Sequence, residues 1–411
     1  MSRINVLWVI DHVCYDGNLH GGGRLYWNVL PRFDKNRVKI VPCMLRATEE
    51  IREIFKTSPV PPRVLDKGKY DLTTLWTFLR LIKSKDIHVM HLHCYGASFF
   101  GRLAGLITGV PTIIHDYDTA VYFPYPWYLR LADRVLAPFT SHAVAASPMV
   151  RDFFIQKRKI HESKIHLMLH AIPVEKYAPI SRATLKRTRD QLKIGQGTRI
   201  VGTITKLGPQ RGNKYLLRVA AHVVKVFPNV VFVLAYKPTV YHRAPSKKFI
   251  DFTRTDNEDT VTDLQSLVDE LDIGKYVRFV EIVDNSDDLI GPFDVFVASF
   301  LSERFSSVNL LEAMAKGKGV IGTDVGEQTE IITSGTNGYL VPPGDEMSLA
   351  TTLIDTLTRP KELDRLSRQA SVSAERFSAD SYARKLQSWY EELAANGRIK
   401  ERKLMRPTGT D

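Results

Sequence analysis

The start of one helix in the second half of the chain has the residue types of an anion site. Asp294–Ser299 is predicted as a buried strand. Ser306 or Ser307 can cap the helix that follows, which we predict over Val308–Lys316. The first backbone N–H groups of that helix would lack partners and would face the carboxyl end of the strand. The sequence therefore predicts a phosphate site at these amides.

Glu312 lies on the same predicted helix, five residues beyond Ser307 and therefore about 7.5 Å further along its axis. A carboxylate at that distance is too far away to contact the phosphates. It can accept hydrogen bonds from the hydroxyl groups of a sugar that lies beside them. An ordinary solvated glutamate is the alternative interpretation of the same residue.

Glycines and histidines mark the ends of predicted strands in the first half of the chain. Gly22 and Gly23 separate the first strand from a helix, where backbone can approach a ligand closely. His91, His93 and His115 lie at the ends of two further strands and could bind a metal ion together with Asp116. Adjacent positions on a strand point to opposite faces, which argues against a shared ion, so we expect no metal site.

Positive charge is distributed unevenly along the chain. Lys and Arg number 57 against 45 Asp and Glu, a net charge of +12. The segment 151–193 contains eleven basic and four acidic residues, and the tail 396–411 contains five and two. Such a band suits an anionic lipid surface, nucleic acid or a phosphorylated substrate. A solvated linker and a frayed tail explain the charge equally well.

Five aromatic residues and two arginines gather in the segment 122–134. A helix packed into the core explains this composition, and an element at a membrane interface or an acceptor site is the alternative. Together with the basic segment 151–193, it suggests peripheral contact with a membrane that carries a lipid-linked acceptor.

Length and composition are those of an ordinary globular protein. The 411 residues correspond to about two domains, and 44% hydrophobic with 25% charged residues excludes wholesale disorder. Three cysteines without a CxxC pair predict no disulfide framework, no structural zinc site and a reducing, cytoplasmic location. No segment has the pattern of a signal peptide or a membrane span.

Short β-branched runs alternate with helical stretches, which predicts βαβ units and the α/β fold class. The strands predicted in the first half are Asn5–Ile10, Val38–Cys43, His88–Leu92, Thr112–His115, Ala143–Ala146 and Ile165–Leu169. Those predicted in the second half are Arg199–Thr205, Val230–Tyr236, Val277–Ile282, Asp294–Ser299 and Gly319–Thr323. The helices predicted between and after them include Arg24–Phe33, Leu72–Lys83, Ser98–Ile107, Asn213–Val226, Val261–Leu271, Met347–Leu357, Lys361–Phe377 and Ala379–Ala394.

The alternation falters over Pro173–Gln196, which indicates a connection between two domains. We predict a Rossmann-like domain over residues 1–175, a linker over 176–198 and a second Rossmann-like domain over 199–377. Two such domains in tandem place a ligand cleft between them, at the carboxyl ends of their strands.

Four strings of residues carry most of the information about function. They are Lys206-Leu-Gly-Pro-Gln-Arg211-Gly, Glu303-Arg-Phe-Ser-Ser-Val-Asn-Leu-Leu-Glu312-Ala-Met-Ala, Val325-Gly-Glu-Gln-Thr-Glu330 and Asn337-Gly-Tyr-Leu-Val-Pro-Pro-Gly-Asp345. Taken in this order, they resemble the motifs of the retaining glycosyltransferases of family four, which have the GT-B fold. The resemblance covers nearly the whole chain and is most specific in the second half.

The resemblance implies a donor site for a nucleotide-diphosphate sugar in the second domain. Lys206 and Arg211 would hold the diphosphate, although the two basic types are exchanged relative to the family. The amides of Ser306, Ser307 and Val308 would lie near phosphate and sugar. Two positive charges at a leaving diphosphate do the work of a metal ion, so no cofactor is expected.

Two departures from the family pattern affect the sugar pocket. Glu312 would bind the ribose, but Glu303 precedes it by nine positions, whereas the family glutamates are eight apart. Either Glu303 reaches the donor sugar through a one-residue bulge or Arg304 lines that pocket. Glu327 replaces the second glycine of the family's Gly-Gly motif. The polar insertion through 238–259 could alter base recognition.

In the first domain the resemblance implies contacts with both substrates. Gly22 and Gly23 would lie over the donor phosphates and the acceptor, and His115 would contact the transferred sugar as the catalytic-site histidine. The positions assigned to the acceptor are His93, Tyr117 and Asp118. A helix over 378–395 would cross back onto this domain, followed by the basic tail 396–411.

The sequence thus predicts a metal-independent glycosyltransferase that transfers a sugar with retention of configuration, as in polysaccharide biosynthesis. Its acceptor would be a saccharide or a lipid-linked molecule, at the inner face of the plasma membrane in the latter case. One alternative is a nucleotide-sugar epimerase on the same fold. Another is a non-catalytic binder of a sugar nucleotide or, with less support, of nucleic acid.

Overall fold

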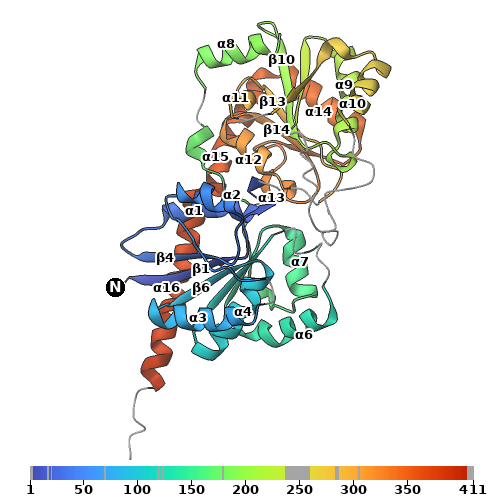
Figure 1. Ribbon diagram of the computed structural model, residues 1–411. Helices are drawn as coiled ribbons and strands as arrows, with labels where there is room; N and C mark the ends of the chain where they lie inside the picture. The colour runs from blue at the N-terminus through green and yellow to red at the C-terminus, as the bar shows by residue number, and fades with distance from the viewer. Residues whose placement is uncertain are drawn as a thin grey trace, which may run out of the picture. The chain divides into compact units, whose positions relative to one another are not determined.

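The computed structural model divides into two compact units (Figure 1). Unit 1 comprises Met1–Ala171 and Ala379–Asp411, and unit 2 comprises Ile172–Ser378. The structure describes residues 3–15, 18–19, 21–68, 71–117, 121, 125–177, 180–236, 260–282, 287–303 and 306–404. The insertion at 238–259, Asp118 and Arg304 therefore lie outside the described residues.

Unit 1 is built on a parallel sheet of seven strands in the order β5-β4-β1-β6-β7-β8-β9. The strands are β1 (Ile4–Ile10), β4 (Val38–Met44), β5 (Arg63–Val64), β6 (Val89–His93), β7 (Thr112–Asp116), β8 (His142–Ala145) and β9 (Ile165–Leu167). A short antiparallel pair, β2 (Cys14–Tyr15) and β3 (Asn18–Leu19), follows β1. The strand order reverses between β1 and β6, as in Rossmann-like folds.

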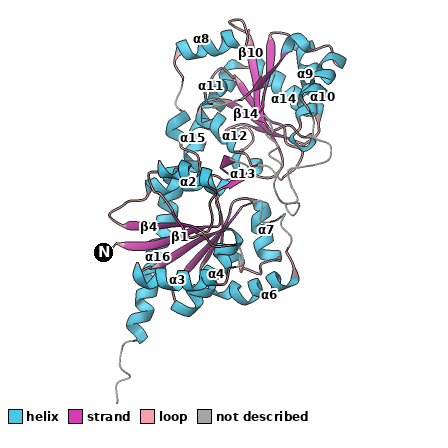
Figure 2. Cartoon of the chain, in the orientation of Figure 1, coloured by secondary structure: helices cyan, strands magenta, loops and turns pink. Residues whose placement is uncertain are grey.

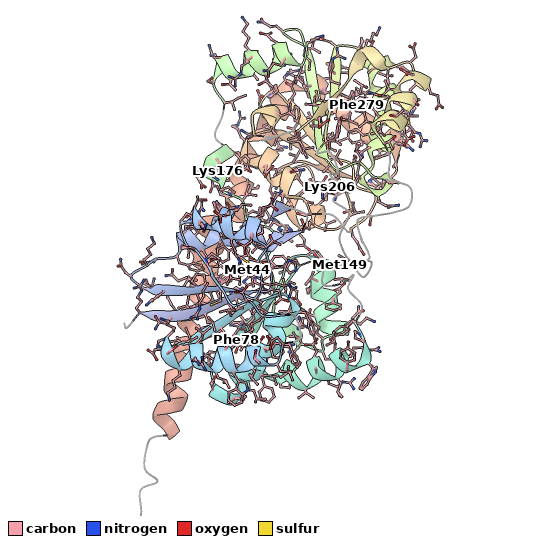
Figure 3. All side chains as sticks on the ribbon, viewed as in Figure 1. Met44, Phe78, Met149, Lys176, Lys206 and Phe279 are labelled. Atoms are coloured by element: carbon pink, nitrogen blue, oxygen red, sulfur yellow. The ribbon has the colours of Figure 1, made fainter. Side chains whose placement is uncertain are left out.

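Helices cover both faces of this sheet (Figure 2). They are α1 (Gly21–Val29), α2 (Glu49–Lys56), α3 (Thr73–Ser84), α4 (Cys94–Thr108), α6 (Trp127–Leu136), α7 (Pro148–Gln156) and α16 (Ala379–Leu404), with short 3₁₀ segments that include η2 (Ala137–Phe139). Alternate residues of the strands enter two separate cores. Met44 packs on the side of α1 and α16, and Phe78 packs on the side of α3 and α4 (Figure 3).

Unit 2 repeats the architecture with six parallel strands in the order β12-β11-β10-β13-β14-β15. The strands are β10 (Arg199–Thr205), β11 (Val230–Tyr236), β12 (Val277–Glu281), β13 (Val295–Ala298), β14 (Gly319–Thr323) and β15 (Tyr339–Val341). The helices are α8 (Arg182–Gln191), α9 (Asn213–Val226), α10 (Val261–Glu270), α11 (Asp287–Ile290), α12 (Val308–Ala315), α13 (Gln328–Ile331), α14 (Glu346–Thr358) and α15 (Pro360–Ala374), with 3₁₀ segments η4 (Val174–Tyr177) and η5 (Pro209–Arg211) among them. Here the order reverses between β10 and β13.

The predicted α/β class with two Rossmann-like domains is confirmed. The segment predicted as a linker, 176–198, belongs to unit 2 in the structure and contains α8. Its end is held by unit 2, because Leu192 and Ile194 are buried and Arg278 donates to the Leu192 carbonyl. Within the described residues, no helix combines the length and apolar character that crossing a membrane requires.

Candidate functional site

Polar side chains of unit 2 gather where the strand order reverses, between β10 and β13. The loop after β10 is joined to the loop after β13, since the Leu301 amide donates to the Gln210 carbonyl at 2.9 Å. The Asn309 side chain, from α12, donates to the Ile204 carbonyl at the end of β10, also at 2.9 Å. Ligands of open α/β sheets bind at such a reversal, beyond the carboxyl ends of the strands.

Gly212 allows the two loops to approach this closely. Its φ of +73° lies in the left-handed region, which side chains with a Cβ rarely adopt. A Cβ at this position would also lie 1.8 Å from the carbonyl oxygen of Ser299. Both constraints require glycine here, and the loop that carries Lys206 and Arg211 is thereby fixed against the end of β13.

The two predicted diphosphate ligands lie at the two ends of this loop. Lys206 is exposed (Figure 3), and its carbonyl accepts hydrogen bonds from Thr205 at 2.8 Å and Asn213 at 3.1 Å. The Arg211 guanidinium lies 5.6 Å from the centre of the Phe300 ring. Desolvation lowers the pKa of Arg211 to about 10, so the side chain stays positively charged at neutral pH.

The start of α12 differs from the prediction in one respect. The Ser307 amide is not left for a ligand, because it donates to the Glu327 carboxylate at 2.7 Å and both residues are buried. Neither serine caps the helix, as the Ser307 side chain makes no capping bond. The Ser306 and Ser307 hydroxyls are buried and have no hydrogen-bond partner among the described residues. A distant carboxylate thus replaces the local serine cap, which the sequence pattern could not reveal.

Glu312 is buried, so the interpretation as a solvated glutamate is wrong. Its carboxylate accepts a hydrogen bond from the Tyr177 hydroxyl at 2.7 Å. The Lys316 ammonium, one helical turn later, lies 5.7 Å from the centre of the Tyr177 ring. Tyr177, from η4, therefore positions the carboxylate predicted to bind ribose, and the sequence analysis did not identify it.

Glu303 is exposed in the loop after β13. Its backbone packs against Gly326, where φ is +56° and a Cβ would lie 2.9 Å from the Glu303 Cα and carbonyl oxygen. The loop after β13 and the turn after β14 are thus in direct contact. The predicted choice between Glu303 and Arg304 at the donor sugar stays open, because Arg304 lies outside the described residues.

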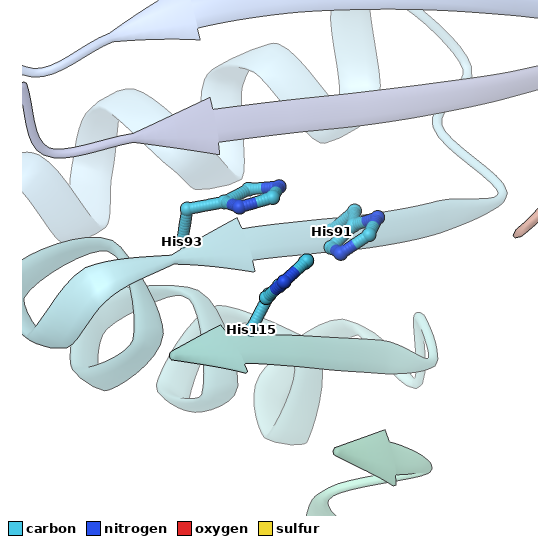
Figure 4. A group of neighbouring side chains, drawn as sticks. All are labelled: His91, His93 and His115. Carbon is cyan, nitrogen blue, oxygen red and sulfur yellow. The ribbon is translucent and has the colours of Figure 1, made fainter. Parts of the chain in front are cut away.

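Three histidines of unit 1, His91, His93 and His115, lie side by side on one face of the sheet and are fully buried (Figure 4). The ring centres of His93 and His115 are 4.7 Å apart, and those of His91 and His93 are 4.5 Å apart. Tyr117 continues the row, with its ring centre 4.8 Å from that of His115. The predicted acceptor residues His93 and Tyr117 therefore lie together with the predicted catalytic histidine.

Each of these histidines has a tyrosine hydroxyl beside it. The distances are 2.6 Å from His91 Nδ1 to Tyr390, 2.9 Å from His93 Nδ1 to Tyr117 and 3.4 Å from His115 Nε2 to Tyr382. Desolvation lowers the pKa of His115 to about 3 and that of His91 well below its ordinary value. The rings of His91 and His115 are therefore neutral at physiological pH and able to exchange hydrogen bonds with hydroxyl groups.

The three histidines do not point to opposite faces of the sheet, so that expectation is wrong for them. His91 and His93 are two positions apart, His93 pairs with His115 across the strands, and ligand atoms of all three lie within 4.8 Å of one another. The rings are stacked or tilted, with interplanar angles of 18° to 31°. The nitrogen lone pairs lie in the ring planes and are therefore nearly parallel, so they do not converge on one point. The trio would have to turn its rings to hold a metal ion.

Asp116 points to the opposite face and belongs to a buried network of ion pairs. Its carboxylate pairs with Arg158, which also pairs with Asp133, and Asp133 pairs with Arg102. Burial acts to raise the pKa of Asp133, but Arg158 and Arg102 outweigh it and lower that pKa to about 2. The network joins α4, α6 and β7 and was not predicted, because its members are far apart in the sequence.

Gly22 and Gly23 are buried in the first turn of α1, directly after the β2–β3 pair. Asp11, at the end of β1, was not singled out from the sequence. Its carboxylate accepts the amides of Gly96 at 2.9 Å and Ala97 at 2.6 Å, at the start of α4. An aspartate directly after the first strand is the signal that could have identified it.

Comparison with known proteins gives the same division of the chain. Residues 186–372 match the family described as "Glycosyl transferases group 1", and residues 20–176 match "Glycosyltransferase Family 4". The protein EpsD of Bacillus subtilis (strain 168) is 26% identical over 308 residues, which are 73% of this chain and 75% of that protein. The "UDP-Gal:alpha-D-GlcNAc-diphosphoundecaprenol alpha-1,3-galactosyltransferase" of Escherichia coli is 20% identical over 311 residues, with 72% and 73% covered.

Among solved structures, the fold is similar to that of Alr3699/HepE from Anabaena in complex with UDP. The TM-score is 0.73 at 17% identity, with 95% of this chain and all of that chain covered. Each family match covers most of one unit and its parallel sheet, and the first match includes the residues at the strand-order reversal of unit 2. The chain therefore belongs to the group 1 glycosyltransferases, has the two-domain GT-B fold and is a glycosyltransferase.

Proposed function

We propose that this glycosyltransferase takes its sugar from a nucleoside diphosphate donor bound by unit 2. The observation that carries the proposal is the pair of cations, Lys206 and Arg211, on a loop that Gly212 fixes beside the start of α12. Two fixed positive charges suit the two charges that develop on a leaving diphosphate. The UDP bound by HepE and the UDP-galactose in the name of the Escherichia coli relative support the same donor class.

We assign the remaining donor contacts to the groups around α12. Glu312, positioned by Tyr177, would accept hydrogen bonds from the ribose hydroxyls. The Ser306 and Ser307 hydroxyls, buried without partners among the described residues, would bind phosphate or sugar oxygens. Because the Ser307 amide is occupied by Glu327, the phosphates would rest mainly on the cations.

We further propose transfer with retention of configuration and without a metal ion, to a saccharide or a lipid-linked saccharide. The leaving phosphate would accept the proton of the acceptor hydroxyl, so no protein nucleophile is required. His115 would contact the transferred sugar through Nδ1, which has no hydrogen-bond partner among the described residues. The diphosphoundecaprenol acceptor named for the Escherichia coli relative supports a lipid-linked acceptor.

The test is a thermal-shift panel of UDP-, GDP- and ADP-sugars, with and without EDTA, on the wild type and the double variant Lys206→Ala/Arg211→Ala. A ligand at about one hundred times its Kd stabilises the folded state by about 2.7 kcal/mol, which is easily measured. We expect one donor to stabilise the wild type equally in EDTA and to fail with the double variant. NMR of the product formed from that donor would then give its anomeric configuration.

The matched control is Lys225→Ala/Arg368→Ala, which removes the same two charges from exposed helix positions of unit 2. This variant should respond to the donor as the wild type does. Equal stabilisation of all three proteins would overturn the assignment of the diphosphate to Lys206 and Arg211. A donor response that EDTA abolishes would overturn the metal-independent mechanism.

A further inference from the structure

Exposed apolar side chains are concentrated on one group of helices in unit 1. Nine of the twelve large hydrophobic side chains found exposed in the described part of the chain belong to α3, α4, α6 and η2 or to the residue before α3. This apolar patch consists of Leu72, Trp76, Leu106, Ile107, Trp127, Tyr128, Leu131, Val135 and Phe139. The other three are scattered over separate helices of unit 2. Such a concentration of exposed apolar side chains on one group of helices favours an interaction surface.

The helices that carry the patch are neighbours. α4 contacts α3, α6 and η2, and Figure 1 shows α3, α4 and α6 along one face of the unit 1 sheet. On α6 the residues Trp127, Tyr128, Leu131 and Val135 fall within about 100° of the helix circumference. Trp127 is 69% exposed and Leu131 is 55% exposed. Of the two interpretations of this segment, packing into the core therefore does not hold for Trp127 and Tyr128.

The exposed charged side chains on the three helices that carry most of the patch are basic, whereas Asp71 and Asp86 lie in the segments before and after α3. Helices α3, α4 and α6, all fully described, contain one acidic residue, Asp133, and it is buried between Arg102 and Arg158. The exposed charged residues of α6 are Arg130 and Arg134, and those of α3 are Arg80 and Lys83. An apolar surface with tryptophan, tyrosine and arginine complements the acidic headgroups and acyl boundary of a bilayer.

We propose that the apolar patch and its flanking cations dock unit 1 on an anionic lipid bilayer. Trp127 and Tyr128 would lie among the headgroups, with Arg130 and Arg134 beside the lipid phosphates. The proposal rests on this surface and leaves the basic segment 151–193, which is divided between the two units after Ala171, as a separate untested prediction. The proposal does not depend on the identity of the donor or the acceptor.

The experiment is sedimentation of the full-length protein with vesicles of phosphatidylcholine, with and without phosphatidylglycerol. We expect binding to the vesicles that contain phosphatidylglycerol. Trp127→Ser/Leu131→Ser should weaken this binding at least about tenfold, since both side chains are exposed and their loss leaves the core intact. Arg130→Gln/Arg134→Gln should also weaken it and reduce its sensitivity to salt.

Val226→Ser/Val372→Ser is the matched control, because it removes two exposed apolar side chains from unit 2. It should bind vesicles as the wild type does. Failure of the wild type to bind, or wild-type binding by Trp127→Ser/Leu131→Ser, would overturn the proposal. Sedimentation equilibrium tests the alternative that the patch is a contact between two copies of the chain. The proposal would be overturned if the wild type were a dimer and Trp127→Ser/Leu131→Ser abolished the dimer without changing vesicle binding. Donor-induced thermal shifts measured on the same variants separate this result from any failure of the proposed function.

Discussion

In both units a carboxylate occupies the start of a helix beside the reversal of strand order. Asp11 accepts two amides of α4 in unit 1, and Glu327 accepts the Ser307 amide before α12 in unit 2. What surrounds the two positions differs. Unit 1 places neutral histidine and tyrosine rings beside β6 and β7, whereas unit 2 places Lys206 and Arg211 after β10.

Under the proposed function, the two units would use the same strand order for two kinds of ligand. Cations on a loop fixed by glycine suit an anionic leaving group. Neutral imidazoles suit sugar hydroxyls, which need hydrogen bonds and carry no charge. Burial keeps His91 and His115 of unit 1 neutral, and Arg211 of unit 2 keeps its charge although desolvation lowers its pKa. The two units therefore share a strand order and differ in the residues at the carboxyl ends of their strands.

The largest effect is expected from the buried ion pairs of unit 1. Arg158→Met removes the partner of Asp116 and Asp133 and leaves their carboxylates buried with too little compensating charge. We expect the free energy of unfolding of unit 1 to fall by about 3–5 kcal/mol. All five tryptophans lie in unit 1, so denaturant unfolding followed by tryptophan fluorescence reports on this unit alone.

Arg52→Met is the matched control, since Arg52 pairs with Asp66 at the surface of the same unit. It should change the free energy of unfolding by less than about 1 kcal/mol. Equal effects of the two substitutions would show that the buried network adds nothing to the stability of unit 1.

The second-largest effect is expected from acidification, which should lower the stability of unit 1. The pKa of His115 is about 3 in the folded state, against an ordinary value of 6.5, so below pH 6.5 the unfolded chain binds a proton that the folded chain excludes. Stability therefore falls as the pH drops from about 6.5 toward about 3. At pH 5 the shifted pKa of His115 lowers the free energy of unfolding by about 2 kcal/mol. Tryptophan fluorescence should show a lower denaturant midpoint for unit 1 at pH 5 than at pH 7.

His115→Gln removes the titrating group and should flatten part of that pH dependence. An unchanged midpoint of the wild type between pH 7 and pH 5 would contradict the neutral state assigned to His115.

A smaller effect is expected at the start of α12. Glu327→Ala leaves the buried Ser307 amide without its acceptor, so we expect a loss of about 1–2 kcal/mol in unit 2. Far-UV circular dichroism must follow this unfolding, because unit 2 contains no tryptophan. Asp324→Ala, at an exposed position of the same turn, is the control and should be nearly neutral. An equally neutral Glu327→Ala would show that this carboxylate does not stabilise the start of α12.

Much of the fold could be predicted from local patterns. The alternation of buried strands and amphipathic helices gave β10 and α9 with the bounds that the structure has. The strands that were missed, β2, β3, β5 and β15, have two or three residues each and too little periodicity to detect. The boundary between the units was displaced because a polar helix, α8, resembles a linker in composition although its end is held by unit 2.

The parts of the candidate site that consist of residues close together in the sequence could be predicted. The contacts between residues far apart in the sequence could not. The cations and Glu312 follow from contiguous strings, but the acceptor of the Ser307 amide lies twenty positions away in the sequence. Tyr177 is 135 positions from Glu312. The exposure of Trp127 could not be inferred either, since an aromatic helix has the same composition in a core and on a surface.

Helix α16 has a consequence for synthesis of the chain. Leu386, Trp389 and Tyr390 belong to the core that covers one face of the unit 1 sheet, although more than two hundred residues separate them from the last strand of that sheet. Unit 2 is continuous in sequence and leaves the ribosome before α16 does. Unit 2 can therefore complete its folding during translation, while the histidine face of unit 1 stays uncovered until α16 emerges. Unit 1 is therefore the first unit to be synthesised and the last to complete its fold.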